Sequence, residues 1–201
     1  MKRLLWIILA VPLLGASSVA GAGEATDLVK QTSERMLAAL ESKRSQIDAK
    51  PVIIYSLVDQ ILVPHFDFER ITRAAVGKSW KQASSTQQGE LTREFQQVLV
   101  RTYATSLLKY SGEEIRYLPE KSGSREGTVT VSTQVREGGA PPIPIDYSLY
   151  RHGAKWLVYD VKIDGVSLVS NYRSSFASQV RSGGIDGLIK SLKQKNSKGT
   201  V

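Results

Sequence analysis

The fold is decided by VTVSTQV at residues 129–135, followed after a loop by IPIDYSL at residues 143–149. In both stretches apolar or β-branched side chains alternate with polar ones, which is the pattern of a strand with one buried face. Gly138 to Pro142 breaks the alternation and predicts the connection between the two strands. We therefore predict an antiparallel pair whose apolar faces lie on the same side of a sheet.

Two further strands extend this pair. Residues 113–118 place Ile115 and Tyr117 on one face, and Trp156 to Ile163 follows the hairpin loop at residues 152–155. Four consecutive strands with short connections predict an antiparallel meander. Because one of its faces is apolar, that face needs a cover of helices.

The flanking segments have helical periodicity. Thr26, Asp67 and Ser85 are suitable N-caps, Pro51 suits a first helical turn, and Gly183-Gly184 is suited to end a helix. We predict an α+β fold in which helices pack on one side of a curved four-stranded meander and form a cone-like lobe. The predicted helices cover residues 26–44, 51–63, 67–76, 85–110, 166–182 and 185–192.

The first 22 residues have the layout of a secretory signal peptide. Lys2 and Arg3 precede the apolar run Leu4–Leu14, and the small residues Ala20-Gly21-Ala22 and Ser18-Val19-Ala20 are two candidate cleavage sites. The run is shorter than the roughly 20 apolar residues that span a bilayer. We predict export to the periplasm, one domain at residues 23–195 with one or two lobes, and a flexible basic tail at 196–201. The chain has no Cys, so disulfides and thiol chemistry are excluded.

The chain is basic, with a formal net charge of +8, of which Lys2 and Arg3 contribute two. Basic proteins often bind nucleic acid, but export removes that partner, and we predict no nucleic-acid binding. Anionic membrane surfaces, acidic proteins and anionic ligands remain open as partners.

Candidate catalytic groups are few. His65, Asp67 and Glu69 have a spacing that a metal site could use, but Asp67 is better placed to cap a helix, so we predict no metal. Asp146 and Asp160 lie on adjacent predicted strands, with Asp160 on the face of Trp156 and Val158 and Asp146 facing away from Ile145. No nucleophile motif accompanies them. We therefore predict no enzyme, no catalytic residue and no cofactor, with an acid/base isomerase or dehydratase using Asp160 or Asp146 as the alternative.

Several segments together resemble the MlaC family, also called the toluene-tolerance auxiliary family. They are VDQILVPHFDFE at 58–69, GKSWKQAS at 77–84, WLVYDV at 156–161, GVSLV at 165–169 and GIDGL at 184–188. The resemblance implies a soluble periplasmic phospholipid carrier with a lobe similar to nuclear transport factor domains and additional helices at both ends. It also implies exchange of lipid between an inner-membrane ABC transporter complex, with its substrate-binding subunit, and an outer-membrane lipoprotein–porin complex, which maintains outer-membrane lipid asymmetry.

The family's acyl-chain cavity lies between sheet and helices, which suggests apolar residues of these elements as its lining. We expect a monomer, with bound phospholipid as cargo, and we expect Arg70, Arg73 and Arg173 to contact the head group or a membrane. The expected acyl-chain contacts are Val58, Leu62, Phe66, Phe68, Ile71, Tyr103, Leu107, Tyr110, Tyr147, Leu149, Val161, Ile163, Val166, Val169, Tyr172 and Phe176.

Overall fold

The computed structural model describes residues 23–136 and 139–198. The predicted signal peptide, residues 1–22, therefore lies outside the described residues, as does the end of the predicted tail, residues 199–201. In the described part of the chain, no helix is both long enough and apolar enough to cross a membrane.

The sheet contains the predicted four-stranded antiparallel meander. Its strands follow the order β1-β3-β4-β5-β6, with β2 paired to β3, and every pairing is antiparallel. The two-residue strand β2 is an addition to the prediction, and β6 occupies Val166 and Ser167, which were predicted to begin the helix at 166–182. The bounds are β1 Glu114–Tyr117, β2 Lys121–Ser122, β3 Thr128–Arg136, β4 Ile143–His152, β5 Lys155–Ile163 and β6 Val166–Ser167.

A β-bulge changes which side chains of β5 share a face. Ser148 pairs with Asp160, but its neighbour Leu149 pairs with Val158, so β5 carries one extra residue at this point. Leu149 and Val158 are buried in the same cluster, and Val161 joins them beyond the bulge. Asp160 therefore lies on the opposite face from Val158. The prediction that the two share a face was wrong, because strict alternation does not hold across a bulge.

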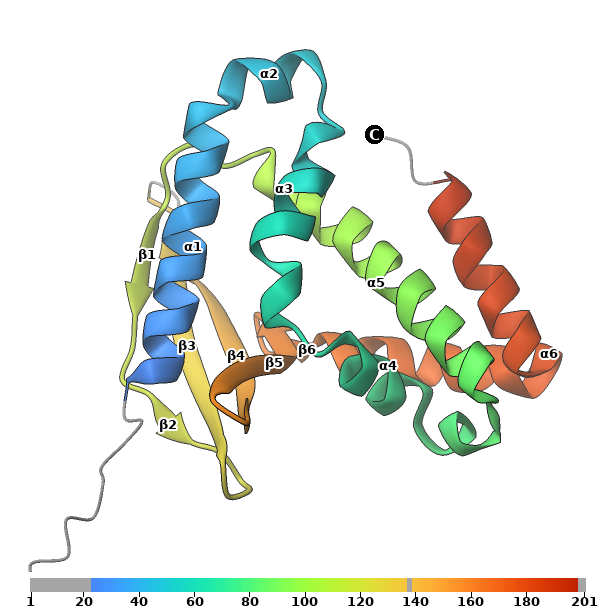
Figure 1. The fold of residues 1–201 in the computed structure, drawn as a ribbon. Coiled ribbons are helices and arrows are strands. Elements are labelled where there is room, and N and C mark those ends of the chain that lie inside the picture. The colour runs from blue at the N-terminus through green and yellow to red at the C-terminus, as the bar shows by residue number, and fades with distance from the viewer. Residues whose placement is uncertain (1–22, 137–138, 199–201) are drawn as a thin grey trace, which may run out of the picture.

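Helices cover the sheet and extend beyond it (Figure 1). α1 lies in front of β3, and the first half of α6 runs beside α4 before the chain turns back along α5. The described part of the chain is thus α+β, as predicted. The bounds are α1 Glu24–Ser42, α2 Arg44–Ala49, α3 Ile53–Ile61, η1 Val63–His65, α4 Phe68–Val76, η2 Gly77–Gln82, α5 Ser85–Leu107 and α6 Leu168–Lys198.

Side-chain caps determine where two of the helices begin. Asp67 caps α4, as predicted, by accepting a hydrogen bond from the backbone N–H of Arg70 at 2.8 Å. Ser84, rather than Ser85, caps α5, and it forms a reciprocal capping box with Gln87. Thr26 lies inside α1 and caps nothing, because its hydroxyl donates to Glu120 at 3.1 Å.

Three apolar clusters hold these elements together. The helical cluster joins α4, η2, α5 and α6, and includes Phe95 and Phe176. The elbow cluster joins α1, α2, α3 and the end of α5, and includes Leu40 and Ile54. The sheet cluster joins the start of α1 to the apolar face of β3, β4 and β5. Phe66, in the link between α3 and α4, packs against both the helical and the sheet clusters.

Gly184 breaks α6 into two helical halves. Its backbone has φ 66° and ψ −170°, a conformation that is essentially restricted to glycine. The second half folds back on α5, where the Asn196 amide donates to the Glu94 backbone carbonyl at 3.0 Å and to its carboxylate at 2.9 Å. The predicted flexible tail is therefore wrong for residues 196–198, since α6 continues to Lys198 and Asn196 is buried by these contacts.

Gly184→Ala is expected to lower the free energy of unfolding by about 1–3 kcal/mol, because alanine disfavours this backbone conformation. No atom lies within 4 Å of the position of an added Cβ, so the cost is conformational rather than steric. Gly183→Ala is the matched control, since Gly183 is helical and equally open. Urea denaturation of the two variants measures the difference, and equal stabilities would contradict the role of Gly184.

Candidate functional site

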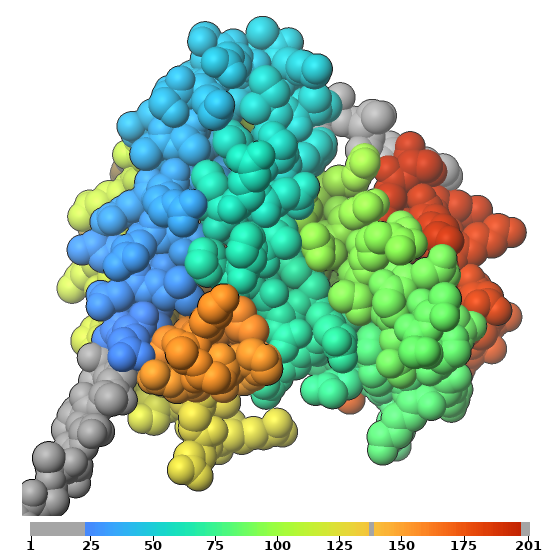
Figure 2. Space-filling view, viewed as in Figure 1, coloured from blue at the N-terminus to red at the C-terminus, as the bar shows by residue number. Residues whose placement is uncertain are grey.

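The candidate site is the apolar region between the sheet and the helices, where the sheet cluster and the helical cluster meet at Phe66. Figure 2 shows α1 and α3 side by side on the face in view, and α1 contacts β3 and β5. Many of the apolar residues expected to contact acyl chains are half-buried at the borders of the clusters, rather than packed at their centres. They are Leu62, Phe66, Phe68, Tyr103, Leu107, Tyr110, Tyr147, Ile163, Val169 and Tyr172.

The remaining expected contacts differ in burial. The Val58 side chain is 6 % exposed and lies within the elbow cluster, whereas Val166 is 57 % exposed at the edge of the sheet. Four others lie inside the clusters, where neighbouring side chains of the protein surround them: Ile71, Leu149, Val161 and Phe176.

An aliphatic strip crosses one end of the apolar sheet face. Directly paired residues of an antiparallel sheet point to the same side. Ile145, Ile163 and Val166 follow one another across β4, β5 and β6. The next row contains Ile115, Val135 and Ile143. We call these six residues the aliphatic strip.

The helices leave part of the aliphatic strip open. Ile143 is 43 % exposed and Val166 57 % exposed, which makes them two of the three large exposed hydrophobic residues among those described. Large apolar side chains that are exposed on a sheet face are candidates for a binding site. Ile115, Val135, Ile143 and Ile145 were not among the expected contacts, although their alternation in sequence placed them on the apolar face.

Tyrosines bring polar groups to this apolar region. Burial raises the pKa of the Tyr147 phenol to about 12, with a further contribution from Tyr117 that a hydrogen bond with Thr133 partly opposes. Burial also raises the pKa of Tyr103, as does its neighbour Tyr172. The phenols of Tyr103 and Tyr147 are consequently neutral at physiological pH. A neutral phenol combines an apolar ring with a hydrogen-bonding tip, which suits the border of an apolar site.

An aromatic group joins α5 to the first half of α6. The Phe95 ring centroid lies 4.8 Å from that of Tyr172 and 4.9 Å from that of Phe176, both in edge-on geometry. Phe95 and Phe176 are almost fully buried. The group therefore acts as a rigid wall beside the half-buried residues.

The Arg70 guanidinium is held by aromatic rings. It lies 3.9 Å from the centroid of Tyr150 and 4.6 Å from that of Tyr159, in cation–π geometry. The Tyr150 hydroxyl donates to Asp67, the residue that caps α4. This arrangement gives Arg70 a structural role in tying α4 to the sheet, which the sequence did not indicate.

Arg73 and Arg173 are exposed and lie outside the aromatic contacts that hold Arg70. Arg73 is in the last turn of α4, and Arg173 extends over Gly77 at the end of that helix, within 3.7 Å of the position that a Cβ on Gly77 would take. Neither forms an ion pair with a carboxylate among the described residues.

The two candidate acid/base residues occupy structural positions. Asp160 accepts hydrogen bonds from the Ser167 hydroxyl at 2.6 Å and from the backbone N–H of Val169 at 3.2 Å, so it anchors the start of α6. Asp146 is paired across the sheet with Lys162. In residues 23–136 and 139–198, no three His, Cys, Asp or Glu residues are grouped so as to hold a metal ion.

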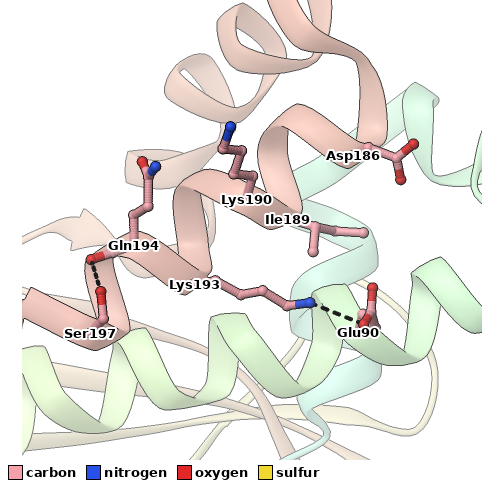
Figure 3. Close-up of a pocket in the computed structure, with 7 residues that line it drawn as sticks. All are labelled: Glu90, Asp186, Ile189, Lys190, Lys193, Gln194 and Ser197. Carbon is pink, nitrogen blue, oxygen red and sulfur yellow. Dashed lines mark hydrogen bonds and ion pairs between the residues drawn. The ribbon is translucent and has the colours of Figure 1, made fainter.

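A separate groove of about 600 Å³ opens between α5 and the second half of α6 (Figure 3). It was not predicted from the sequence. Lys193 crosses it to form an ion pair with Glu90 at 3.1 Å. Ile189 is the one apolar residue among those that line it, and the other lining residues carry polar or charged groups. The lining residues are Glu90, Asp186, Ile189, Lys190, Lys193, Gln194 and Ser197.

Comparison with known proteins identifies the family. The family model described as MlaC protein matches residues 30–194, which is most of the chain. This chain belongs to the MlaC family. The predicted resemblance is therefore confirmed.

Individual MlaC relatives are similar over most of their length. The toluene tolerance protein ttg2D of Pseudomonas putida is 25 % identical over 186 residues, covering 92 % of this chain and 84 % of the relative. The intermembrane phospholipid transport system binding protein MlaC of Haemophilus influenzae is 25 % identical over 174 residues, covering 85 % and 81 %.

A solved structure shares the fold of this MlaC-family chain. It is the phospholipid-binding protein from Ralstonia solanacearum, determined in complex with a phospholipid. The two superpose with a TM-score of 0.79 at 31 % sequence identity, covering 87 % of this chain and 97 % of the other. Helices and antiparallel sheet are thus arranged as in a protein that binds phospholipid.

Proposed function

We propose that this chain is a periplasmic phospholipid carrier. The observation that supports the proposal most strongly is the likeness, over 87 % of the chain, to a structure that contains a phospholipid. The aliphatic strip and the half-buried residues around it are the part of this chain with the right chemistry for the hydrocarbon of such a ligand.

The physical need for a carrier follows from the hydrophobic effect. Two acyl chains contain roughly thirty CH₂ groups, and each costs about 0.8 kcal/mol to expose to water. Moving a phospholipid through water without a carrier therefore costs more than about 20 kcal/mol of free energy. A protein that keeps the chains out of water removes most of this cost without making or breaking a covalent bond.

We place the acyl chains between the sheet and the helices. The chains would contact the aliphatic strip on one side and Leu62, Phe66, Leu107 and Tyr172 on the other. Val166 and Ile143 are exposed enough to form the opening. The tyrosine hydroxyls would then lie where hydrocarbon gives way to polar groups.

The proposed cargo path runs between two membranes. The carrier, as a monomer, would receive lipid from one complex and deliver it to the other: the inner-membrane ABC transporter with its substrate-binding subunit, and the outer-membrane lipoprotein–porin complex. This exchange would maintain the lipid asymmetry of the outer membrane. We propose a carrier rather than an enzyme, because Asp160 anchors α6 instead of facing the apolar region.

The proposal is tested by organic extraction of the protein purified from the periplasm, followed by mass spectrometry. We expect phospholipid in near-equimolar amount. A periplasmic protein of similar size and charge, purified through the same steps, controls for lipid carried along from the membrane. A folded protein with no more phospholipid than this control would refute the proposal.

A further inference from the structure

Two segments that lie far apart in sequence contain cations and no acidic residue. No acidic residue occurs from residue 70 to residue 89, and none occurs from residue 165 to residue 185. These segments contain six cations: Arg70, Arg73, Lys78, Lys81, Arg173 and Arg181. The chain without Lys2 and Arg3 has a formal charge of +6, and residues 187–201 form a third segment with four lysines and no acidic residue.

The fold brings the two segments together. α4 and η2 pack against the first half of α6, which runs beside α4 in Figure 1. The Arg173 side chain crosses from α6 to the end of α4, within 3.7 Å of the position of a Cβ on Gly77. Trp80, which is 7 % exposed, anchors η2 in the helical cluster and thereby fixes the position of Lys78 and Lys81.

Five of these cations are exposed, and we call them the basic face: Arg73, Lys78, Lys81, Arg173 and Arg181. None forms an ion pair with a carboxylate in the described part of the chain. The nearest acids in sequence lie outside both segments. Glu69 precedes Arg73 by one helical turn, and Asp186 accepts a hydrogen bond from the Gln87 amide at 2.7 Å. Arg70 is excluded because Tyr150 and Tyr159 hold it.

We propose that the basic face docks the protein onto the surface of an anionic phospholipid bilayer. Long basic side chains that are free of internal partners are attracted to anionic head groups, and each contributes separately. This inference does not depend on whether the apolar region holds lipid.

The polar residues that lie between the basic side chains favour a bilayer over an acidic protein as the partner. Specific protein interfaces usually have a core of apolar or aromatic residues. On the exposed side of α6 the residues around Arg173 and Arg181 are hydrophilic, namely Ser170, Asn171, Ser174, Ser175, Ser178 and Ser182. A polar, cationic surface is suited to a layer of head groups, which it can approach without a matching shape.

The test is co-sedimentation of the mature chain with vesicles of phosphatidylcholine that contain phosphatidylglycerol, and with vesicles of phosphatidylcholine alone. We expect binding to the anionic vesicles at low salt, and weaker binding as salt screens the charges. The variant Arg73→Gln/Lys78→Gln/Lys81→Gln/Arg181→Gln should bind the anionic vesicles at least about tenfold less well. It leaves Arg173 in place, because that side chain packs over Gly77.

A matched control removes the same charge elsewhere. Lys30→Gln/Lys50→Gln/Lys109→Gln/Lys121→Gln alters four exposed lysines outside the basic face and should weaken vesicle binding by less than about threefold. Equal losses in both variants would show that net charge alone drives binding and would overturn the proposal. If the unaltered protein does not bind anionic vesicles, the proposal also fails, and an acidic protein surface becomes the alternative partner of the basic face. Phospholipid content after extraction reports separately on the carrier function.

Discussion

Val166→Asp is expected to fold normally and to purify with at least about tenfold less phospholipid than the unaltered protein. Val166 is 57 % exposed, so a carboxylate is tolerated in the empty protein. It lies directly across from Ile163 on the aliphatic strip, where an acyl chain would desolvate the charge. Burial of an unpaired charge against hydrocarbon costs several kcal/mol, and each 1.4 kcal/mol weakens binding about tenfold.

Val52→Asp is the matched control for this experiment. Val52 is also a large exposed hydrophobic residue, at 41 %, but it precedes α3 and lies away from the sheet. Aspartate is favourable at the start of a helix, so the control should be stable and retain its lipid. Organic extraction followed by mass spectrometry measures the amount of phospholipid bound to each variant. Equal lipid content in the two would remove Val166 from the proposed opening.

Phe95→Ala is expected to lower the free energy of unfolding by about 3–5 kcal/mol, the largest loss of stability that we predict. Phe95 is fully buried and contacts both Tyr172 and Phe176. Its removal leaves a cavity between α5 and α6 that rigid neighbours fill poorly. Urea denaturation, monitored by circular dichroism, measures the change.

Tyr172→Phe provides the comparison for Phe95→Ala. It keeps the ring beside Phe95 and removes only the hydroxyl of a half-buried residue, so a change below about 1 kcal/mol is expected. If Phe95→Ala cost no more than Tyr172→Phe, the aromatic group would not be the rigid wall that we describe.

Features with a short-range cause could be predicted from the sequence. The alternation in residues 129–135 and 143–149 predicted β3 and β4 in their observed pairing, because side-chain period reports directly on a half-buried strand. Asp67 was predicted to cap α4, since a cap bonds to the backbone three residues on. Gly183-Gly184 was predicted to break a helix, and the break is observed at Gly184.

Predictions failed where a distant residue decides the outcome. The cap of α5 is an exception: Ser85 was predicted, but Ser84 is the cap, and its capping box with Gln87 is a local pattern that the sequence contained. Asn196 belonged to a predicted flexible tail, yet Glu94 on another helix holds it in place. The acyl-chain contacts stay a prediction, and only burial in the folded chain separates the expected residues inside the clusters from those at the borders.

The sequence by itself determined the order of helices and strands, the apolar face of the sheet and the family resemblance, because each depends on the spacing of residues that are close in sequence. Only the tertiary structure decided the rest. The bulge at Ser148 and Leu149 places Asp160 on the face opposite Val158. The rings of Tyr150 and Tyr159 hold the Arg70 guanidinium. The packing of α4 and η2 on α6 brings two segments without acidic residues together. Each outcome depends on which distant residues meet, and that is set by packing rather than by any local pattern.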